Sequence, residues 1–488
     1  MRAQKTVGWI AVVTTLAALL TTGCSGSGEE GSASTTASTG RADRAGVAAS
    51  AEVVTPEKLP PLTLSHLTQV AEAGSGESLA YDPRSGTVYL AWARPIPAED
   101  GEPAMQAVVA RSTDRGKTWS KPVVVNAPVH TQVHAHTVNP VDVEVGPNGD
   151  VYVLYAHPVA WKPPAEDVEK PSWMLPIHPF ITRSEDGGQT FSKPVAVVTD
   201  SVEDLSLGTG IFRYHDLLVA SDGDLFVSFL NNTAYLEAAV KKARSGDEAH
   251  TEIPVPTTRL EVTRSRDDGQ TWVPTVLVAK TTCGCCGTMV AENAEGVLFA
   301  GTRGMQPLEG SYDAVRDIIV ARSTDDGTTW SEPVKISDDG FKISGCPDVA
   351  PGLASDADGT LHAAWYTGTS AHPGVYYATS EDGVHWSKPL TLLRGEWVPY
   401  ADVRLVIDGQ GRPWVAFEDR TGEVDRLQVV MINPRTHAVA FSKAIPGHGP
   451  ALAAGEDWAL LSFEANLTED DAAGPTALQS VLVSGADT

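Results

Sequence analysis

The chain has 488 residues, with 36 Lys or Arg against 62 Asp or Glu, so its formal net charge at pH 7 is −26. No basic run follows Lys5, and this composition excludes nucleic-acid binding from the expected functions. The acidic balance is more simply a solubility feature of an exported protein.

A targeting segment opens the chain. Arg2 and Lys5 precede an apolar run at 7–20, and Thr-Thr-Gly-Cys24 follows it. The run is too short for an ordinary membrane span and has the layout of a secretory signal. Small residues before Cys24 resemble the cleavage site of bacterial lipoproteins, in which the cysteine becomes the lipidated first residue. Thr21 stands where that family prefers Leu, and an ordinary secretory signal is the alternative.

The lipoprotein resemblance implies three segments. Residues 1–24 would be the signal peptide with lipidated Cys24, and 25–61 a flexible tether rich in Ser, Gly, Thr and Ala. Residues 62–488 would form the folded domain. The protein is then expected on the outer face of the bacterial cell membrane, with the membrane as a partner through the lipid anchor only.

Five copies of one short phrase run through the domain. They are Ser112–Trp119, Ser184–Phe191, Ser265–Trp272, Ser323–Trp330 and the shortened Ser380–Trp386. Their Ser and Asp side chains can bond backbone groups of a tight turn, Gly accepts positive φ, and the aromatic residue packs on a neighbouring strand. The Ser positions lie 72, 81, 58 and 57 residues apart, which predicts a radial or solenoid array. The phrases resemble the Asp-box, or BNR, repeat of sialidases and other β-propellers, which implies an all-β propeller.

A second repeated pattern indicates the number of blades. It is a Gly turn followed by an alternating strand, at Gly86–Trp92, Gly149–Tyr155, Gly223–Phe229, Gly296–Ala300, Gly359–Trp365, Gly411–Phe417 and Gly455–Leu461. Seven such turns predict seven four-stranded blades, with the Asp-box lost from the last two. The seventh blade lacks its own outer strand, which Leu62–Val70 is expected to supply. Six blades, as in catalytic sialidases, is the alternative.

Blade topology sorts the loops by face. Asp-boxes join the third and fourth strands, so they belong to one face as scaffold. The segments before the inner strands belong to the opposite face and are expected to ring one mouth of the channel; they are 130–136, 212–216, 283–287, 345–348, 400–404 and 447–449. The candidate site is therefore placed at that mouth.

Four cysteines besides Cys24 are the sharpest chemical signal: Cys283, Cys285, Cys286 and Cys346. Three interpretations of these cysteines stay open. Structural disulfides are the ordinary use of cysteine in an exported protein, and a bridge from the cluster to Cys346 would tie blade four to blade five. Metal ligation and a redox-active thiol or disulfide are the other two.

Three histidines are candidate partners of these cysteines. His134 and His136 are two residues apart and would share one face of a strand, while His215 precedes the third inner strand. Thiolate and imidazole together suit copper or zinc better than calcium or magnesium. The sequence therefore predicts a transition-metal site at the mouth, with copper or zinc as the candidate cofactor.

Candidate ligand-binding residues at the same mouth are Arg303, Arg316, Asp317, Asp348 and Arg404. The resemblance to sialidases implies three arginines for the substrate carboxylate, a Tyr–Glu nucleophile pair and an Asp acid. Only Arg303 and Arg404 resemble arginine positions, and the first inner strand carries Ser78–Tyr81 where the family has Phe-Arg-Ile-Pro. Exported BNR proteins with a Cys cluster, Arg-Asp-Ile and Gly-Cys-Pro are more similar, and that resemblance implies no activity.

Three functions remain as alternatives. The leading one is a surface-anchored propeller with a Cys/His transition-metal or redox site at the channel mouth. The second is an exo-glycosidase of sialidase type. The third is a non-catalytic interaction platform with structural disulfides, whose ligand would be a small molecule, a glycan or a protein.

Overall fold

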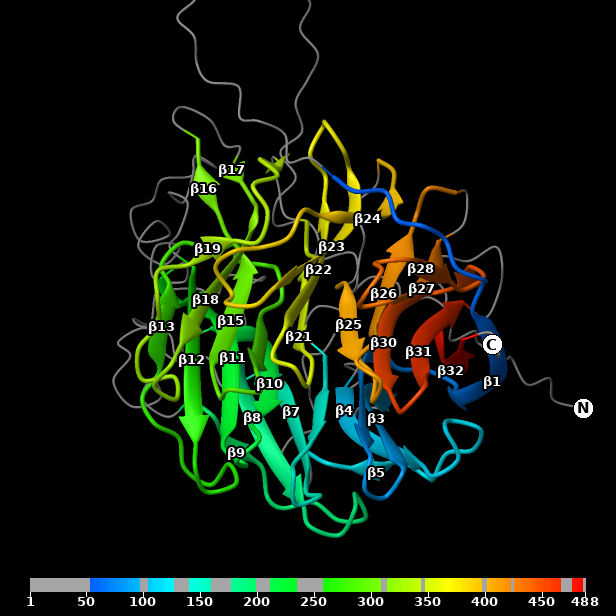
Figure 1. The fold of residues 1–488 in the computed structure, drawn as a ribbon. Helices are drawn as coiled ribbons and strands as arrows, with labels where there is room; N and C mark the ends of the chain where they lie inside the picture. Colours follow the sequence, from blue (N-terminus) through cyan, green and yellow to red (C-terminus); the bar gives the residue numbers. More distant parts are fainter. Residues whose placement is uncertain are drawn as a thin grey trace, which may run out of the picture.

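The computed structural model describes residues 53–96, 104–126, 140–158, 177–198, 211–234, 258–308, 314–343, 347–396, 402–422, 425–466 and 476–485. Within these residues the fold is a ring of antiparallel sheets, each starting with an inner strand and ending with an outer one (Figure 1). The described residues contain no helix long and apolar enough to cross a membrane.

The first four blades follow one another along the chain. Blade one contains β2 (Ser75–Asp82), β3 (Thr87–Ile96), β4 (Ala104–Ser112) and β5 (Val123–Val124). Blade two contains β6 (Asp142–Val145), β7 (Val151–Pro158), β8 (Ile177–Ser184) and β9 (Val195–Ala196). Blade three contains β10 (Phe212–Val219), β11 (Leu225–Asn231), β12 (Arg259–Ser265) and β13 (Val276–Ala279). Blade four contains β14 (Met289–Glu292), β15 (Leu298–Arg303), β18 (Ile318–Ser323) and β19 (Val334–Lys335).

The last three blades complete the ring. Blade five contains β21 (Gly352–Ser355), β22 (Leu361–Thr367), β23 (Gly374–Ser380) and β24 (Leu390–Arg394). Blade six contains β25 (Arg404–Ile407), β26 (Pro413–Asp419), β27 (Arg426–Ile432) and β28 (Val439–Phe441), with β29 (Ile445–Pro446) also on β27. Blade seven contains β30 (His448–Ala454), β31 (Trp458–Asn466), β32 (Thr476–Ser484) and β1 (Thr63–Ala71). A small sheet of β16 (Gln306–Pro307), β17 (Ala314–Val315) and β20 (Lys342–Ile343) stands beside blade four.

The ring closes because strands from the two ends of the chain pair in the same blade. β1 pairs antiparallel with β32, so the first strand of the chain is the outer strand of the last blade. In Figure 1 the blue β1 accordingly lies beside the red β32. The inner strands also contact one another all round, and β2 touches both β6 and β30. The predicted seven-bladed propeller, closed by the segment at 62–70, is confirmed.

Seven hydrophobic clusters hold the ring together, and each is shared by two neighbouring blades. One of them joins blade seven to blade one through Trp92, Trp458 and Leu482. The second strand of a blade is sandwiched between neighbours on both faces, and this explains why β11, β22 and β26 are buried along their whole length. Closure thus buries every blade face, because no blade is left at an end.

The Asp-boxes form the turns between third and fourth strands, as predicted. In the second copy, Ser184 Oγ accepts a hydrogen bond from Gly188 N at 2.8 Å, and Asp186 Oδ1 accepts from Thr190 N at 2.9 Å. The hydroxyl of Thr190 also donates to Asp186 Oδ2 at 2.6 Å. These bonds, with that of the Thr190 hydroxyl first, lower the pKa of Asp186 to about 2. The carboxylate is therefore a fixed part of the turn, on the face opposite the inner-strand loops.

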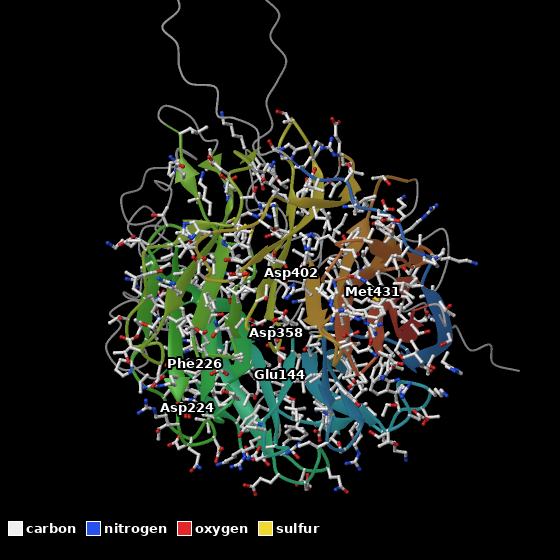
Figure 2. The ribbon with its side chains drawn as sticks, viewed as in Figure 1. Glu144, Asp224, Phe226, Asp358, Asp402 and Met431 are labelled. Carbon is white, nitrogen blue, oxygen red and sulfur yellow. The ribbon has the colours of Figure 1, made fainter. Side chains whose placement is uncertain are left out.

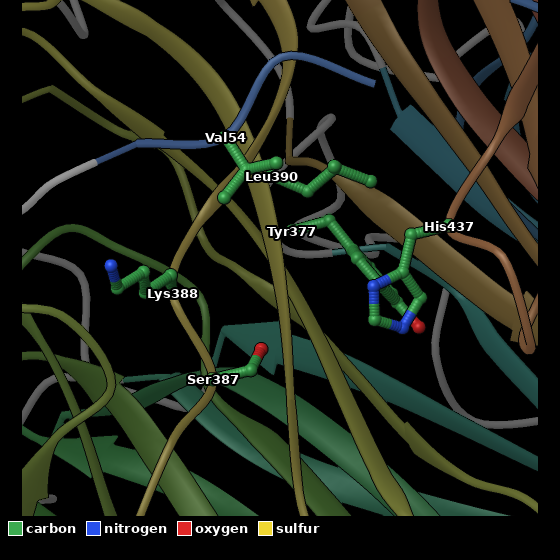
Figure 3. A pocket seen from close by; sticks show the side chains of 6 residues that line it. All are labelled: Val54, Tyr377, Ser387, Lys388, Leu390 and His437. Carbon is green, nitrogen blue, oxygen red and sulfur yellow. The ribbon is translucent and has the colours of Figure 1, made fainter. Parts of the chain in front are cut away.

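The segment before β1 straps the outer edges of two blades. Val54 forms a parallel bridge with Leu390 of β24, and Lys58 forms one with Val439 of β28. Leu59 N donates to Val439 O at 2.7 Å. A pocket of about 190 Å³ lies where this strap meets blade five, and Figure 3 shows Val54 beside Leu390 at its edge. The strap, 53–61, is the end of the segment for which the sequence predicts a flexible tether.

Candidate functional site

The cysteine segment, 283–287, lies between the outer strand of blade three and the inner strand of blade four. Cys283 N donates to Arg303 O at 2.8 Å, and Asn232 Nδ2 donates to Gly284 O at 2.9 Å. A Cβ at Gly284 would lie 2.8 Å from Thr258 Oγ1, so a larger residue would push this backbone away. The path of the chain around the sulfur atoms is therefore fixed by blades three and four.

Gly287 marks the point where three blades meet. A Cβ there would lie 2.8 Å from Ala350 Cβ of blade five and 3.1 Å from Asp402 Oδ2 of blade six. Ala350 N in turn donates to Asp402 Oδ1 at 2.5 Å. The predicted convergence of the segments before inner strands is thus observed for blades four, five and six.

Three sulfur atoms gather in the segment. Cys286 Sγ lies 3.2 Å from Cys283 Sγ, and Cys285 Sγ lies 3.6 Å from Cys283 Sγ on the other side. Cys283 and Cys286 are not in disulfides and have no exposed surface, whereas Cys285 is disulfide-bonded and partly exposed. Among the described residues, this is the one group of three Cys, His, Asp or Glu side chains whose ligand atoms lie within 4.8 Å of one another.

The two thiols are electrostatically unequal. A hydrogen bond from Cys286 and the positive charge of Arg316 lower the pKa of Cys283 to about 6, against the opposing effect of burial. Arg316 Nη1 donates to Cys283 Sγ at 2.9 Å. Burial raises the pKa of Cys286 well above its usual range, and its hydrogen bond to Cys283 raises it further. The pair therefore consists of one thiolate-forming sulfur and one proton-donating thiol.

Asp348 lies close to this pair. It adopts a left-handed backbone conformation, with φ of 50°. The residue is exposed to solvent, yet enough protein surrounds its carboxyl group that burial raises its pKa to about 7, helped by the charges of Cys283 and Asp402. A carboxyl group that changes charge near neutral pH thus lies at the solvent side of the buried thiols.

Carboxylates on the inner strands link neighbouring blades around the centre of the ring. Asp142 accepts a hydrogen bond from Leu217 N at 2.9 Å, and Asp216 accepts one from Val290 N at 2.7 Å. Each bond joins one blade to the next. Burial raises the pKa of Asp216 well above its usual range, and the charge of Asp142 adds to this effect.

The channel carboxylates come from blades far apart in the sequence. In Figure 2, Glu144 and Asp402 lie near the centre of the ring, whereas Asp224 lies toward its rim. Glu77 is 3% exposed, and neither of its carboxylate oxygens has a hydrogen-bond partner. Burial raises its pKa well above the usual range, and the charge of Glu464 raises it further. Sequence reasoning missed these groups, because single acidic residues in short alternating strands form no motif.

The candidate arginines differ in what they contact. Arg303 is 1% exposed, and its guanidinium donates to the carbonyl oxygens of Arg316 and Tyr366 at 2.8 and 2.9 Å. It ties blades four and five together. Arg404 Nε donates to Pro450 O at 3.3 Å, and Arg404 Nη2 lies 3.6 Å from Asp402 Oδ2. Arg303 contacts Cys283 through its backbone carbonyl, whereas Arg316 donates from its guanidinium to the Cys283 sulfur.

Two other candidates also have structural contacts. Asp317 Oδ2 forms an ion pair with Lys335 Nζ at 2.8 Å, and Asp317 Oδ1 accepts a hydrogen bond from Phe341 N at 3.1 Å. His215 is buried on β10, with Nε2 3.0 Å from Pro140 O, and burial lowers its pKa to about 4. His215 is not part of the sulfur group. His134, His136 and Cys346, like Cys24, lie outside the described residues.

Comparison with known proteins gives the fold and no family. No protein-family model matches the chain, and no curated protein matches it. A protein of unknown function from Dyadobacter fermentans is similar in structure, with a TM-score of 0.50 and 12% identity, over 87% of this chain and 100% of that one. An ulvan lyase, a polysaccharide lyase, is similar with a TM-score of 0.50 and 11% identity, over 86% of this chain and 96% of its own.

A sialidase from Trypanosoma rangeli is similar with a TM-score of 0.45 and 14% identity, over 88% of this chain and 59% of that chain. The two structures with a TM-score of 0.50, the Dyadobacter protein and the ulvan lyase, share the architecture of this chain. At these identities the likeness shows the fold alone.

Proposed function

We propose that this protein is an exported, lipid-anchored β-propeller that binds a thiophilic transition-metal ion at Cys283 and Cys286. One observation supports the proposal above all. The sulfur atoms of a buried Cys-x-x-Cys pair lie 3.2 Å apart where three blades meet, with a third sulfur beside them.

The donor set favours a soft, singly charged ion. Thiolates select copper(I) and zinc over calcium and magnesium. Cys285 is in a disulfide, so its sulfur offers no thiolate until that bond is reduced. The guanidinium of Arg316 donates to Cys283 and places a full positive charge beside the site. That charge opposes a divalent ion more strongly than a monovalent one, and for this reason we put copper(I) ahead of zinc.

Each residue has a distinct part in such a site. Cys283 and Cys286 would hold the ion, which would supply a soft Lewis-acid or electron-transfer centre when bound. Arg316 would orient the Cys283 sulfur from outside the ligand set. Gly284 and Gly287 keep the backbone close to blades three, five and six, where a side chain would collide.

The metal proposal is tested by anaerobic titration of the reduced protein with copper(I) against a chromophoric copper(I) chelator. One tightly bound ion per chain is expected, and it should be lost in Cys283→Ser and in Cys286→Ser. Met289→Leu is the matched control, because it removes a buried sulfur two residues beyond the segment, nearly conserves side-chain volume and leaves every thiol in place. Zinc titration of the same samples decides between the two ions. If both Cys variants hold copper(I) as tightly as the wild-type protein, the site lies elsewhere.

The anchor is a separate part of the proposal and rests on the signal-like segment that ends at Cys24. Replacing Cys24 with Ser in the full chain is expected to move the protein from the membrane fraction to the soluble exported fraction, because the lipid would no longer be attached. Fractionation followed by immunoblotting measures this. Unchanged membrane association of the variant would mean that something other than lipidation holds the protein there.

A polysaccharide ligand is the second candidate, favoured by the ulvan lyases that share this fold over nearly their whole length. Sialidase chemistry is less well supported, because the guanidinium of Arg303 is already bonded to two backbone carbonyls. Incubation with uronate-containing polysaccharides and with a fluorogenic sialoside tests both activities. Absence of unsaturated products and of released fluorophore would remove this candidate.

A further inference from the structure

The three sulfur atoms of the cysteine segment are in different chemical states. Cys283 is the central one, 3.2 Å from the free thiol of Cys286 and 3.6 Å from the sulfur of Cys285. Cys285 is already part of a disulfide. A thiol in contact with a disulfide sulfur is the arrangement from which thiol–disulfide exchange begins.

We propose that Cys283, Cys285 and Cys286 form a thiol–disulfide exchange relay. In its first step the Cys283 thiolate attacks Cys285 Sγ. The bond between Cys285 and its present partner breaks, the partner leaves as a thiolate, and a Cys283–Cys285 disulfide forms. In the second step Cys286 attacks Cys283 Sγ, its proton passes to the departing sulfur, and Cys285 leaves as a thiol. One disulfide is consumed and one is formed, so no external oxidant is needed.

The order of attack follows from the contacts of Cys283. Its sulfur lies 3.2 Å from Cys286 Sγ and 3.6 Å from Cys285 Sγ, so it can react with either. Arg316 Nη1 donates to it at 2.9 Å and so stabilises its thiolate. Arg316 is itself fixed, since its backbone N donates to Phe341 O and its carbonyl accepts from Arg303 Nη1, both at 2.8 Å. Cys283 is therefore the attacking sulfur and Cys286 the resolving one, as in Cys-x-x-Cys oxidoreductases.

Burial defines what the relay exchanges with. Cys283 and Cys286 have no exposed surface, so a protein disulfide cannot reach them, whereas Cys285 is partly exposed. Cys285 is thus the sulfur that can react with a thiol or disulfide dissolved in the solvent. Its counterpart must be a small thiol or disulfide. The relay goes beyond metal binding and does not depend on it, although a Cys283–Cys286 disulfide would remove the two metal ligands.

The relay is tested on the metal-free, chelator-treated full chain. The protein is equilibrated anaerobically in a series of reduced and oxidised glutathione mixtures, quenched in acid, alkylated and mapped by mass spectrometry. The expected product has Cys283 and Cys286 joined and Cys285 alkylated, over a range of intermediate potentials. If Cys285 stays bonded while Cys283 and Cys286 are both alkylated until the whole protein is reduced, the relay does not exist.

Variants assign the steps. Cys286→Ser is expected to stop after the first step and leave some Cys283–Cys285 disulfide, whereas Cys283→Ser should leave Cys285 in its original bond. Met289→Leu should behave as wild type. If a Cys variant does not fold, as judged by near-UV circular dichroism, the wild-type map alone decides. Copper(I) binding without the exchanged disulfide would refute only the relay, and the exchanged disulfide without copper(I) binding would refute only the metal proposal.

Discussion

At the scale of single residues, the charge of Arg316 controls the chemistry of Cys283. Arg316 is 8% exposed, so water screens its charge little, and its guanidinium donates directly to the sulfur. Burial alone would raise the pKa of Cys283, and the hydrogen bond from Cys286 and the charge of Arg316 reverse that effect. Without these two effects, Cys283 would be protonated and unreactive, like the buried thiol of Cys286.

The first residue-scale prediction is that Arg316→Met raises the pKa of Cys283. The wild-type thiol should react with iodoacetamide increasingly as the pH rises through about 6. In the variant this rise moves to higher pH, and each unit of the shift lowers the thiolate population about tenfold at pH values well below 6. The pH dependence of alkylation at Cys283, read by mass spectrometry, measures it. Arg322→Met is the control, because Arg322 bonds to Asp382 O in an Asp-box turn. Equal pH profiles for wild type and Arg316→Met would show that Cys286 alone sets the thiolate.

At the scale of elements, sequence periodicity predicted most of the fold. The Gly turns and Asp-boxes recur in every blade where they were expected, because a two-residue alternation and a turn motif are local properties of the chain. The closing strand was also predicted, because an unpaired edge in blade seven requires a partner. The strap at 53–61 was not predicted. Its residues have no alternation, and only their contacts with β24 and β28 order them.

The same distinction applies to the site. Cys283, Arg316 and Asp348 were found from the sequence, because their segments precede inner strands or carry recognisable phrases. The inner-strand carboxylate of Asp142 was not, since its partner is a backbone amide of the next blade. Such contacts depend on how blades pack, which no local pattern encodes.

The element-scale prediction concerns the strap. A chain starting at Val53 keeps it, and a chain starting at Leu62 loses it together with its hydrogen bonds to Pro389, Thr391 and Val439. The shorter chain should unfold at lower temperature and aggregate more readily, because the outer edges of β24 and β28 become open to pairing with other chains. Calorimetry and light scattering on the two truncations measure this. The matched pair differs only in the strap, so identical behaviour would show that it contributes no stability.

At the scale of the whole molecule, closing the ring forces acidic side chains from separate blades into one channel. Glu77 belongs to blade one and Glu464 to blade seven, and the charge of Glu464 helps to raise the pKa of Glu77 across the closure. Burial raises the pKa of Glu464 to about 7. The acidic net charge of the chain adds repulsion in the same direction.

The last prediction is that the folded domain loses stability as the pH rises from about 4.5 to about 7. Glu464 has a folded pKa of about 7 and an unfolded value near 4.5, so between these values the folded state binds more protons than the unfolded state. Its contribution to stability is complete below pH 4.5 and is lost as the pH rises through 7. The melting temperature should therefore fall across this range, and Glu464→Gln, which cannot ionise, should flatten the fall. Glu295→Gln is the control, because this exposed carboxyl lies in a β-turn outside the channel. The same pH dependence of the melting temperature in the wild-type protein and in Glu464→Gln would mean that Glu464 is ionised in the folded protein over this range.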